Sequence, residues 1–389
     1  MRLRHAVIPA VLLLLSGCSA WNTVSGWFST TDETVQPPAP LTQFQQSINV
    51  IQLWSRGTGS GTDGQYLKLS PVVANQRVYI VDTDGNLSAM DATNGREIWS
   101  KDIDARITGG PGYGDKTVLI GTDKGKVMAF DADSGKRLWR ASVSSEILSA
   151  PQRSGSTVVV RTIDGKLFGL DGDSGRREWV YDRSVPSLTL RGTGAPVISN
   201  GTIVAGFDGG RLAALELHTG KLKWEARVAE PKGTSELERM VDIDSAPVII
   251  DGVAYVVSFQ GQLAAVEMSS GRLLWSRDVS SYAGFAADKS SIYVTDSDSD
   301  VIAYDRYTGS ELWKQEKLHN RGVTAPAVIG DYIVVGDKEG YLHWIKKQNG
   351  AFAARNRISE DRIIAAPVVA GKILYAYDTD GELGAYTYR

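Results

Sequence analysis

The stretch that decides the fold is SPVVANQRVYIVDTDGNLSAMDATNGREIW, from Ser70 to Trp99. Its landmarks are an opening Pro, a glycine in a turn, and a second glycine four residues before a Trp. The same landmarks return in SAPVIIDGVAYVVSFQGQLAAVEMSSGRLLW, from Ser245 to Trp275. The chain is therefore built from repeats, and its fold has to be sought in one repeating unit.

Eight copies of this pattern follow one another, and the spacing of the landmarks within a copy is constant. The opening positions are Pro71, Pro111, Pro151, Pro196, Pro247, Phe285, Pro326 and Pro367. The turn residues are Gly85, Gly125, Gly165, Gly210, Gly261, Ser299, Gly340 and Gly381. The second glycines are Gly95, Gly135, Gly175, Gly220, Gly271, Gly309 and Gly350. Because the spacing does not change, every copy is expected to form the same structure.

Each copy is predicted to be a four-stranded antiparallel meander. Alternating apolar stretches flank pairs such as Asp84-Gly85 and Asp380-Gly381, a strong hairpin signal because Gly adopts the backbone conformations of a tight turn without steric cost. One meander cannot bury both faces alone, and a four-stranded unit that recurs about every 40 residues is typical of a β-propeller. A β-sandwich would not repeat this register, so the fold class is all-β, an eight-bladed β-propeller.

The ends of the chain complete the count of blades. The eighth copy stops at Arg389, before its fourth strand could form, whereas an unassigned Trp strand runs from Val50 to Arg56. We expect this N-terminal strand to complete the last blade and close the ring, which leaves no free sheet edge between blades. The recurring Trp is expected to pack between blades. Copy seven has Ala354 in place of that Trp, with Phe352 or Trp344 as candidates to fill the space.

The N-terminus is typical of an export signal. Arg2 and Arg4 precede a short apolar run, and Leu15-Ser16-Gly17-Cys18 resembles the bacterial lipobox, whose cysteine is acylated and becomes the new N-terminus. An ordinary signal peptide with a chance cysteine is the alternative. We therefore expect a signal peptide over 1–17, a lipidated flexible tether over 18–45 and the propeller over 46–389. In the resembling lipoproteins an Asp after the cysteine retains the protein in the inner membrane, so Ser19 implies the outer membrane.

The motif A-x-D-x-x-T/S-G-x-x-x-W resembles the repeat of the pyrroloquinoline-quinone dehydrogenases, whose propellers also have eight blades. Those enzymes pair two adjacent cysteines over the quinone and hold calcium with acidic residues, whereas Cys18 is the only cysteine here. The resemblance therefore implies the fold without the enzyme, and neither a cofactor nor a metal is expected.

The sequence gives equally little support for a metal site, a phosphate-binding loop or binding of nucleic acid. The histidines, each expected at the surface, lack the spacing of metal ligands, and they are His5, His218, His319 and His343. Asp296, Asp298 and Asp300 imitate a calcium loop but lack its Gly and Glu, so we interpret them as a turn. The Gly57 to Gly61 run lacks the Lys of a phosphate loop and is expected to be a flexible connector. A net charge of −3 makes nucleic acid an unlikely partner.

Length variation is confined to the connectors between copies. Two neighbouring connectors are long: Trp179 to Pro196 spans 17 residues and Trp224 to Pro247 spans 23, against 12 from Trp99 to Pro111 and from Trp139 to Pro151. Both should emerge on the rim that carries the Asp-Gly turns. They mix apolar and charged residues in loops, a composition that marks an interaction site more often than a cap over the central channel. The residues predicted to bind a partner are Leu188, Leu190, Arg191, Asp242 and Asp244.

Lipobox, tether, eight repeats without a quinone site and the L-T-L-R-G and D-I-D loops together resemble the BamB family, the lipoproteins of the outer-membrane β-barrel assembly machine. The resemblance covers essentially residues 1 to 389. It implies docking onto the periplasmic domains of the barrel subunit BamA, with help in delivering or inserting nascent outer-membrane proteins. In that family Leu188, Leu190, Arg191, Asp242 and Asp244 occupy positions implicated in docking, where the two acids either contact the partner or position Arg191.

Overall fold

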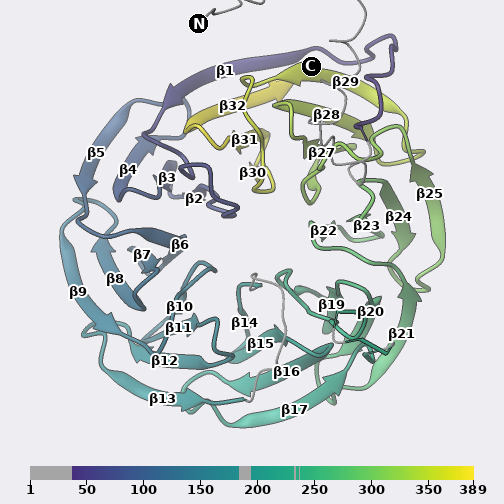
Figure 1. Ribbon diagram of the computed structural model, residues 1–389. Helices are drawn as coiled ribbons and strands as arrows, with labels where there is room; N and C mark the ends of the chain where they lie inside the picture. The colour runs from purple at the N-terminus through teal and green to yellow at the C-terminus, as the bar shows by residue number, and fades with distance from the viewer. Residues whose placement is uncertain (1–36, 184–193, 232–233, 236) are drawn as a thin grey trace, which may run out of the picture. The chain divides into compact units, whose positions relative to one another are not determined.

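The computed structural model describes residues 37–183, 194–231, 234–235 and 237–389. Every regular element within these residues is a β-strand, and the strands form eight four-stranded sheets. Figure 1 shows the sheets as blades around one axis, with the first strand of each blade innermost. The predicted all-β, eight-bladed β-propeller is therefore confirmed.

Each blade is an antiparallel meander whose strands follow chain order. Blades one to four consist of β2 Val72–Ala74, β3 Arg77–Val81, β4 Asn86–Asp91, β5 Glu97–Asp102; β6 Ile107–Gly114, β7 Thr117–Thr122, β8 Lys126–Asp131, β9 Arg137–Ser142; β10 Gln152–Ser154, β11 Thr157–Arg161, β12 Leu167–Asp171, β13 Arg177–Tyr181; and β14 Val197–Ser199, β15 Thr202–Phe207, β16 Arg211–Glu216, β17 Leu222–Arg227. Blades five to eight consist of β18 Val248–Ile250, β19 Val253–Val257, β20 Gln262–Glu267, β21 Leu273–Asp278; β22 Gly284–Ala287, β23 Ser291–Thr295, β24 Val301–Asp305, β25 Glu311–Gln315; β26 Ala327–Ile329, β27 Tyr332–Gly336, β28 Tyr341–Lys346, β29 Phe352–Arg357; and β30 Val368–Ala370, β31 Ile373–Tyr377, β32 Glu382–Tyr388, β1 Val50–Gly57.

The turn between the second and third strands supports the connector that leaves the same blade. Gly85 has φ +102°, and the N–H of Ile103 in the connector donates to its carbonyl at 3.0 Å. The same contact joins Val143 to Gly125 and Val228 to Gly210, so connectors and Asp-Gly turns share one rim, as predicted. Ser299, which replaces the glycine in blade six, takes φ +72° and its hydroxyl accepts hydrogen bonds from the next connector.

The recurring Trp packs between blades and explains the second glycine. The ring of Trp139 lies on Gly175 of the next blade, where a Cβ would come within 2.6 Å of Cε3, and its Nε1 donates to Gly172 O at 2.8 Å. The glycine is therefore required twice, by its positive φ and by the indole above it. The same pairs are Trp54 on Gly95, Trp99 on Gly135, Trp179 on Gly220, Trp224 on Gly271, Trp275 on Gly309 and Trp313 on Gly350.

The N-terminal strand closes the ring as predicted. β1 pairs antiparallel with β32 from Val50 opposite Tyr388 to Gly57 opposite Glu382. The backbones of Asn49 and Arg389 exchange two hydrogen bonds of 3.0 Å at the end of this pairing. One blade is therefore built from both ends of the chain, which couples its stability to the whole ring.

Blade seven departs from the Trp pattern for a topological reason. Blade eight has no turn between its third and fourth strands, because β32 ends the chain and β1 begins the ring. No glycine is available there to receive a Trp, and Ala354 takes the position. Trp344 fills the space instead, fully buried and 5.7 Å from the ring of Tyr388. Phe352 stacks on Phe44 at 5.2 Å.

Two details differ from the sequence-based expectation. The run from Gly57 to Gly61, expected to be a flexible connector, is tied to blade eight by Thr58 N–H donating to Gly381 O and to blade one by Thr83 N–H donating to Gly61 O. His343, expected at the surface, is fully buried on β28 and bonded to Asp337. His218 is exposed, and Asp296 accepts the backbone N–H groups of Asp298 and Asp300 as a turn residue.

Candidate functional site

The predicted partner-binding residues fall in two connectors, of which the structure describes one for the most part. Asp242 and Asp244 lie in the connector from β17 to β18, between blades four and five. Cys18, Leu188, Leu190 and Arg191 lie outside the described residues. The site is therefore built from the acidic end of the second connector and from the blade residues around it.

The residue between the two acids belongs to the repeat core. Ile243 is fully buried, and its side chain packs over Gly206 at a distance that no Cβ could tolerate. Ile147 packs over Gly121 and Ile363 over Gly336 in the same way. Asp242 and Asp244 are the residues directly before and after this fixed anchor. Their positions are therefore set by the blade and not by the loop.

Asp242 is held inside the rim. Its side chain is only 1% exposed, its backbone forms an isolated bridge with Asp208, and its carboxylate accepts the N–H of Gly209 at 3.4 Å. Its carbonyl accepts the N–H of Phe259 at 2.9 Å. Asp242 thus joins the turn between the second and third strands of blade four to the corresponding turn of blade five, which begins at Phe259.

Arg161 supplies the positive charge beneath this rim. It ends the apolar strand β11, is 1% exposed, and its guanidinium lies 3.9 Å from Asp208 and 5.2 Å from the ring centre of Phe207. Burial raises the pKa of Asp208 to about 6, against the charge of Arg161, which lowers it, and with that of Asp242, which raises it further. The three acids therefore share one buried cation, an arrangement in which carboxylates compete for ionisation.

Asp244 has the least favourable environment of the three acids. Both carboxylate oxygens are buried, and neither has a hydrogen-bond partner among the residues that the structure describes. Burial raises its pKa to about 7, and the charges of Asp242 and Asp208 add to this while those of Arg161 and Lys68 oppose it. A buried carboxylate without a hydrogen bond lowers the stability of the fold. Such residues are found at functional sites more often than elsewhere.

A second ion cluster borders the first. Glu225 on β17 accepts hydrogen bonds from Arg183 and Arg211, and Arg183 also lies 5.8 Å from the ring centre of Phe207. Although burial opposes it, these two arginines lower the pKa of Glu225. Sequence reasoning missed Arg161, Asp208, Arg183 and Glu225. A charged residue closing the apolar run Thr157 to Val160 was the one available signal.

The rest of the second connector is folded back on the propeller. Ser235 and Glu238 cap one turn reciprocally, since Glu238 accepts the N–H of Ser235 and Ser235 Oγ accepts the N–H of Glu238. Met240 and Val241 are buried, whereas Leu237 is 62% exposed. Most of the apolar residues described in this connector therefore serve the fold, and Leu237 is available to a partner.

Lys68 links two blades across the ring. It precedes β2 of blade one, and its ammonium donates to Tyr282 O at 2.8 Å and Ala283 O at 3.3 Å, just before β22 of blade six. Lys68 and Asp244 stand at the same place in their copies, three residues before the opening Pro. The inner ends of the blades thus carry charges of both signs around the axis.

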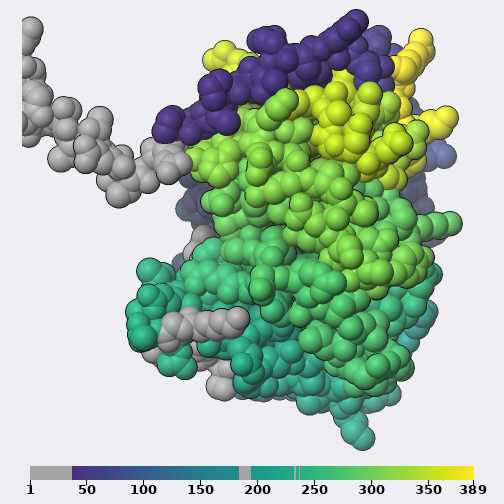
Figure 2. All heavy atoms as spheres, turned by 90° about the vertical axis from the view of Figure 1, so that its right-hand side faces the viewer, coloured from purple at the N-terminus to yellow at the C-terminus, as the bar shows by residue number. Residues whose placement is uncertain are grey.

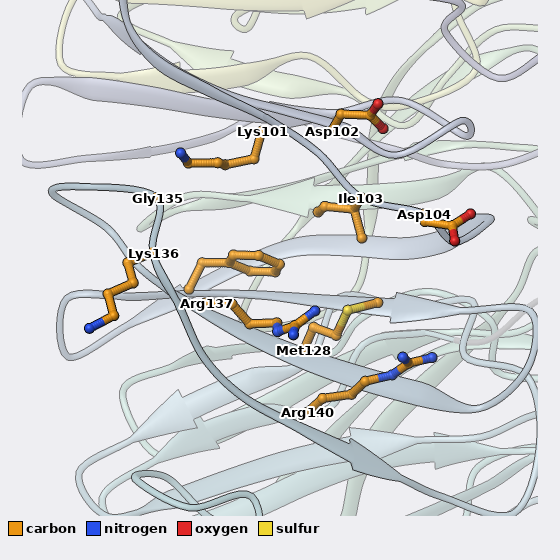
Figure 3. A pocket seen from close by; sticks show the side chains of 10 residues that line it. Lys101, Asp102, Ile103, Asp104, Met128, Gly135, Lys136, Arg137 and Arg140 are labelled. Carbon is orange, nitrogen blue, oxygen red and sulfur yellow. The ribbon is translucent and has the colours of Figure 1, made fainter.

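A groove of about 510 Å³ lies on the outer wall between blades one and two. Figure 3 shows basic side chains around Ile103 and Met128. Within the described part of the chain, the side chains of Lys101, Lys136, Arg137 and Arg140 have no ion pair or hydrogen bond. Arg277, at the place of Lys101 in blade five, instead donates to Gly309 O and Thr308 O of the next blade. The groove is therefore open where the equivalent position in blade five is bonded to its neighbour.

The residues do not fit a quinone cofactor or its metal. The chain has one cysteine, so no cysteine pair can face a quinone. The described ranges contain no group of three His, Cys, Asp or Glu side chains placed to hold a metal. The acids that do gather, Asp208, Asp242 and Asp244, are arranged around Arg161, and two of them have raised pKa values.

No helix in the described part of the chain is long and apolar enough to cross a membrane. Comparison with solved structures finds the crystal structure of BamB from Moraxella catarrhalis, with a TM-score of 0.79 and 31% identity over 87% of this chain and all of that one. The quinohemoprotein alcohol dehydrogenase from Comamonas testosteroni has a TM-score of 0.66 and 14% identity over 87% of this chain and 76% of that one. The second similarity is one of fold alone.

Whole-length relatives agree with the first structure. The outer membrane protein assembly factor BamB of Pseudomonas aeruginosa is 47% identical over 99% of both chains, and that of Escherichia coli is 35% identical over all of both. The sequence profile described as outer membrane protein assembly factor BamB matches residues 51–104, 83–315 and 308–389. Fold, repeat register and full-length similarity agree, and the chain belongs to the BamB family of outer membrane protein assembly factors.

Proposed function

We propose that this protein is a non-catalytic scaffold of the outer-membrane β-barrel assembly machine. It docks on the periplasmic domains of BamA and assists the delivery and insertion of outer-membrane proteins. The observation that carries the proposal is the similarity, over the whole chain, to relatives named as outer membrane protein assembly factors. The poor fit of the residues to a quinone agrees with a role in binding rather than oxidation.

The docking surface is assigned to the two long connectors. Leu188 and Leu190 alternate along the first connector, so in an extended chain both would project from one side, with Arg191 on the other. Asp242 is 1% exposed and therefore suits the positioning of Arg191 better than direct contact with a partner. Both carboxylate oxygens of Asp244 are buried as well, so the same argument applies to Asp244.

Lipidation of Cys18 anchors the protein on the periplasmic face of the outer membrane. The support is the lipobox and the Ser at position 19. Cys18→Ser should give a folded protein that is released from the membrane fraction, because the acyl chains contribute only to the anchor. A variant recovered in the outer-membrane fraction at wild-type levels would contradict the anchor or assign retention to the partner.

The docking surface is tested with a triple variant, Leu188→Ala, Leu190→Ala and Arg191→Ala. Because apolar and Arg anchors concentrate interface energy, each at about 2 kcal/mol or more, co-purification with BamA should be lost while the Tm is almost unchanged. Leu222→Ala, an exposed leucine on the outer strand of blade four, is the control and should retain binding. Retained binding by the triple variant would place the interface elsewhere, and a large fall in Tm would make these residues part of the fold.

The alternative is a quinone-dependent dehydrogenase or a propeller that senses a small ligand. Titration of the purified protein with pyrroloquinoline quinone and calcium decides this. We expect no saturable binding, and dye-linked oxidation of alcohols by the loaded protein would overturn the scaffold.

A further inference from the structure

The N-terminal segment does more than complete blade eight. Residues Pro38 to Asn49, most of which the sequence placed in the flexible tether, lie against the outer face of blade seven before β1 begins (Figure 1). Figure 2 shows this segment, in purple, over the yellow-green region near the C-terminus. Ser47 N–H donates to Ala353 O at 2.8 Å and Ala39 N–H to His319 O at 2.9 Å.

Two arginines of the propeller bind the backbone of this segment. Arg321, in the connector before blade seven, donates from Nη1 to Ala39 O at 3.0 Å. Arg355, on β29, donates from Nη1 to Thr42 O at 3.1 Å, and its guanidinium lies 5.1 Å from the ring centre of Phe44. Phe44 in turn stacks on Phe352. The contacts are therefore both polar and apolar, and they extend over six residues.

Four side chains, here called the blade-seven network, bind one another at this place; three of them are buried and Arg355 is partly buried. The network consists of Arg321, Asp337, His343 and Arg355. Arg321 Nε donates to Asp337 Oδ2 at 2.8 Å, and His343 Nε2 lies 2.8 Å from the same oxygen. Arg355 Nε donates to His343 Nδ1 at 3.1 Å. Because an arginine nitrogen can only donate, Nδ1 is the acceptor and His343 is neutral, with its proton on Nε2.

The turn that carries Asp337 does not need this network. Asp337 Oδ1 alone accepts the N–H groups of Glu339 and Tyr341 that define the turn. At the equivalent turn of blade eight, Asp378 Oδ1 accepts the same two hydrogen bonds, so that turn also depends on one carboxylate oxygen. The second oxygen of Asp337 is therefore available for Arg321 and His343, whose chain of bonds ends at the N-terminal segment.

The segment itself is suited to docking in a fixed shape. In Pro37-Pro38-Ala39-Pro40 only Ala39 has a backbone N–H, and it is this group that binds His319 O. Proline-rich backbone is already extended, so little conformational entropy is lost when it binds. The polar groups of Ala39 are both satisfied by the propeller.

We propose that the blade-seven network is a receptor for the chain's own N-terminal segment, and that docking of Ala39 to Phe44 fixes the side of the propeller from which the membrane tether leaves. Blade seven lies across the ring from blade three (Figure 1). The first proposed docking connector runs from blade three to blade four. Within the described residues, the point where the tether leaves blade seven is thus on the opposite side of the ring from the blade at which the first docking connector begins. The consequence for the tether rests on the proposed lipid anchor, whereas the docking itself does not.

Hydrogen exchange of the full-length chain tests the docking. Phe44→Ala and Arg355→Ala should each speed exchange of the Ala39 amide about tenfold, while Asn49, held by the pairing with Arg389, stays slow. Arg140→Ala is the matched control, since Arg140 stands opposite Met128 in blade two as Arg355 stands opposite His343, and it should change nothing. If Arg355→Ala destabilises the propeller, Phe44→Ala decides, because Phe44 lies outside every sheet. An Ala39 amide that exchanges freely in the wild type, or that exchanges at the wild-type rate in both variants, overturns the docking.

Fluorescence quenching on vesicles tests the consequence. The lipidated chain, labelled at Gln348→Cys in blade seven or Asp173→Cys in blade three, is bound to phosphatidylethanolamine–phosphatidylglycerol vesicles with a quencher on the headgroups. Quenching at position 348 should be about twice that at 173, since the chain reaches the membrane from blade seven, and Phe44→Ala should remove the difference. Equal quenching in the wild type overturns the consequence. A chain that does not bind vesicles overturns the lipid anchor and with it that consequence, while hydrogen exchange still decides the docking.

Discussion

Trp54, at the start of the described chain, lies on Gly95 of blade one, where a Cβ would come within 2.6 Å of its ring. This contact joins the closing blade to the first, and it repeats between most neighbouring blades. This glycine is required for two separate reasons, its positive φ and the indole that lies on it. Substitutions at different glycines can therefore separate the loss of stability caused by positive φ from the loss caused by overlap with the indole.

Gly95→Ala should destabilise the protein more than Gly371→Ala does. Both glycines have positive φ, +69° and +62°, but the space around Gly371 is open. Alanine at positive φ costs about 1 kcal/mol, and the overlap with Trp54 adds about 1–3 kcal/mol at position 95 only. Chemical denaturation of both variants measures the difference, and equal losses would show that Trp54 moves aside freely.

Removal of residues 46–56 should lower the free energy of unfolding by at least about 3 kcal/mol, because Trp54 leaves the core and β32 loses its partner. Thermal melting measures this. A chain that lacks residues 19–36 keeps β1 and is expected to melt as the full chain does. An unchanged melting curve after removal of 46–56 would mean that the ring is stable without its closing strand.

Placing the Trp of the other blades at position 354 in blade seven should lower the stability of the protein. Ala354→Trp places an indole in a fully buried position without a receiving glycine, and overpacking costs about 1–3 kcal/mol. Adding Trp344→Ala, directly opposite on β28, should recover part of the loss because it empties the same space. A more stable single variant would contradict the topological explanation.

Asp244→Asn should stabilise the protein at high pH. The folded-state pKa of about 7 lies above the unfolded value near 3.9, so ionisation costs stability as pH rises from about 4 to 7. Asparagine removes that cost, and we expect a gain on the order of 2 kcal/mol at pH 8 that vanishes near pH 4. Asp242→Asn, which weakens the hydrogen bond from Gly209, should show no such gain. The urea midpoints of the variant and the wild type are compared at pH 8 and near pH 4. If the variant differs from the wild type by the same amount at both pH values, this explanation is wrong.

His343→Gln should reduce the loss of stability in acid. Burial lowers the folded-state pKa of His343, and the positive charges of Arg355 and Arg321 lower it further, while Asp337 opposes them. Stability from the neutral ring is therefore complete above the unfolded pKa of about 6.5 and is lost as pH falls toward the lower folded value. Glutamine keeps one donor and one acceptor without titrating. Guanidinium denaturation between pH 7.5 and 5 measures how steeply the unfolding midpoint falls with pH in the wild type and in His343→Gln, with exposed His218→Gln as the control. An equally steep fall in the wild type and in His343→Gln would contradict the prediction.

The candidate site was only partly open to prediction. The connectors were found from their lengths, and Asp242 and Asp244 from their spacing and the family resemblance. Arg161 and Asp208 were not, because their proximity to Asp244 joins blades three, four and five. The roles of Leu188, Leu190 and Arg191 stay predictions.

By itself, the sequence determined the repeat, its register, the number of blades and the closing strand, because turn geometry and strand alternation are local and depend on residues a few positions apart. Tertiary structure alone decided that Gly95 receives Trp54, that His343 is buried, and that Ala39 to Phe44 dock on blade seven. It also left the Asp244 carboxylate buried with no hydrogen bond from the described part of the chain. These contacts join residues up to hundreds of positions apart, and burial is a property of the assembled ring that no single repeat contains.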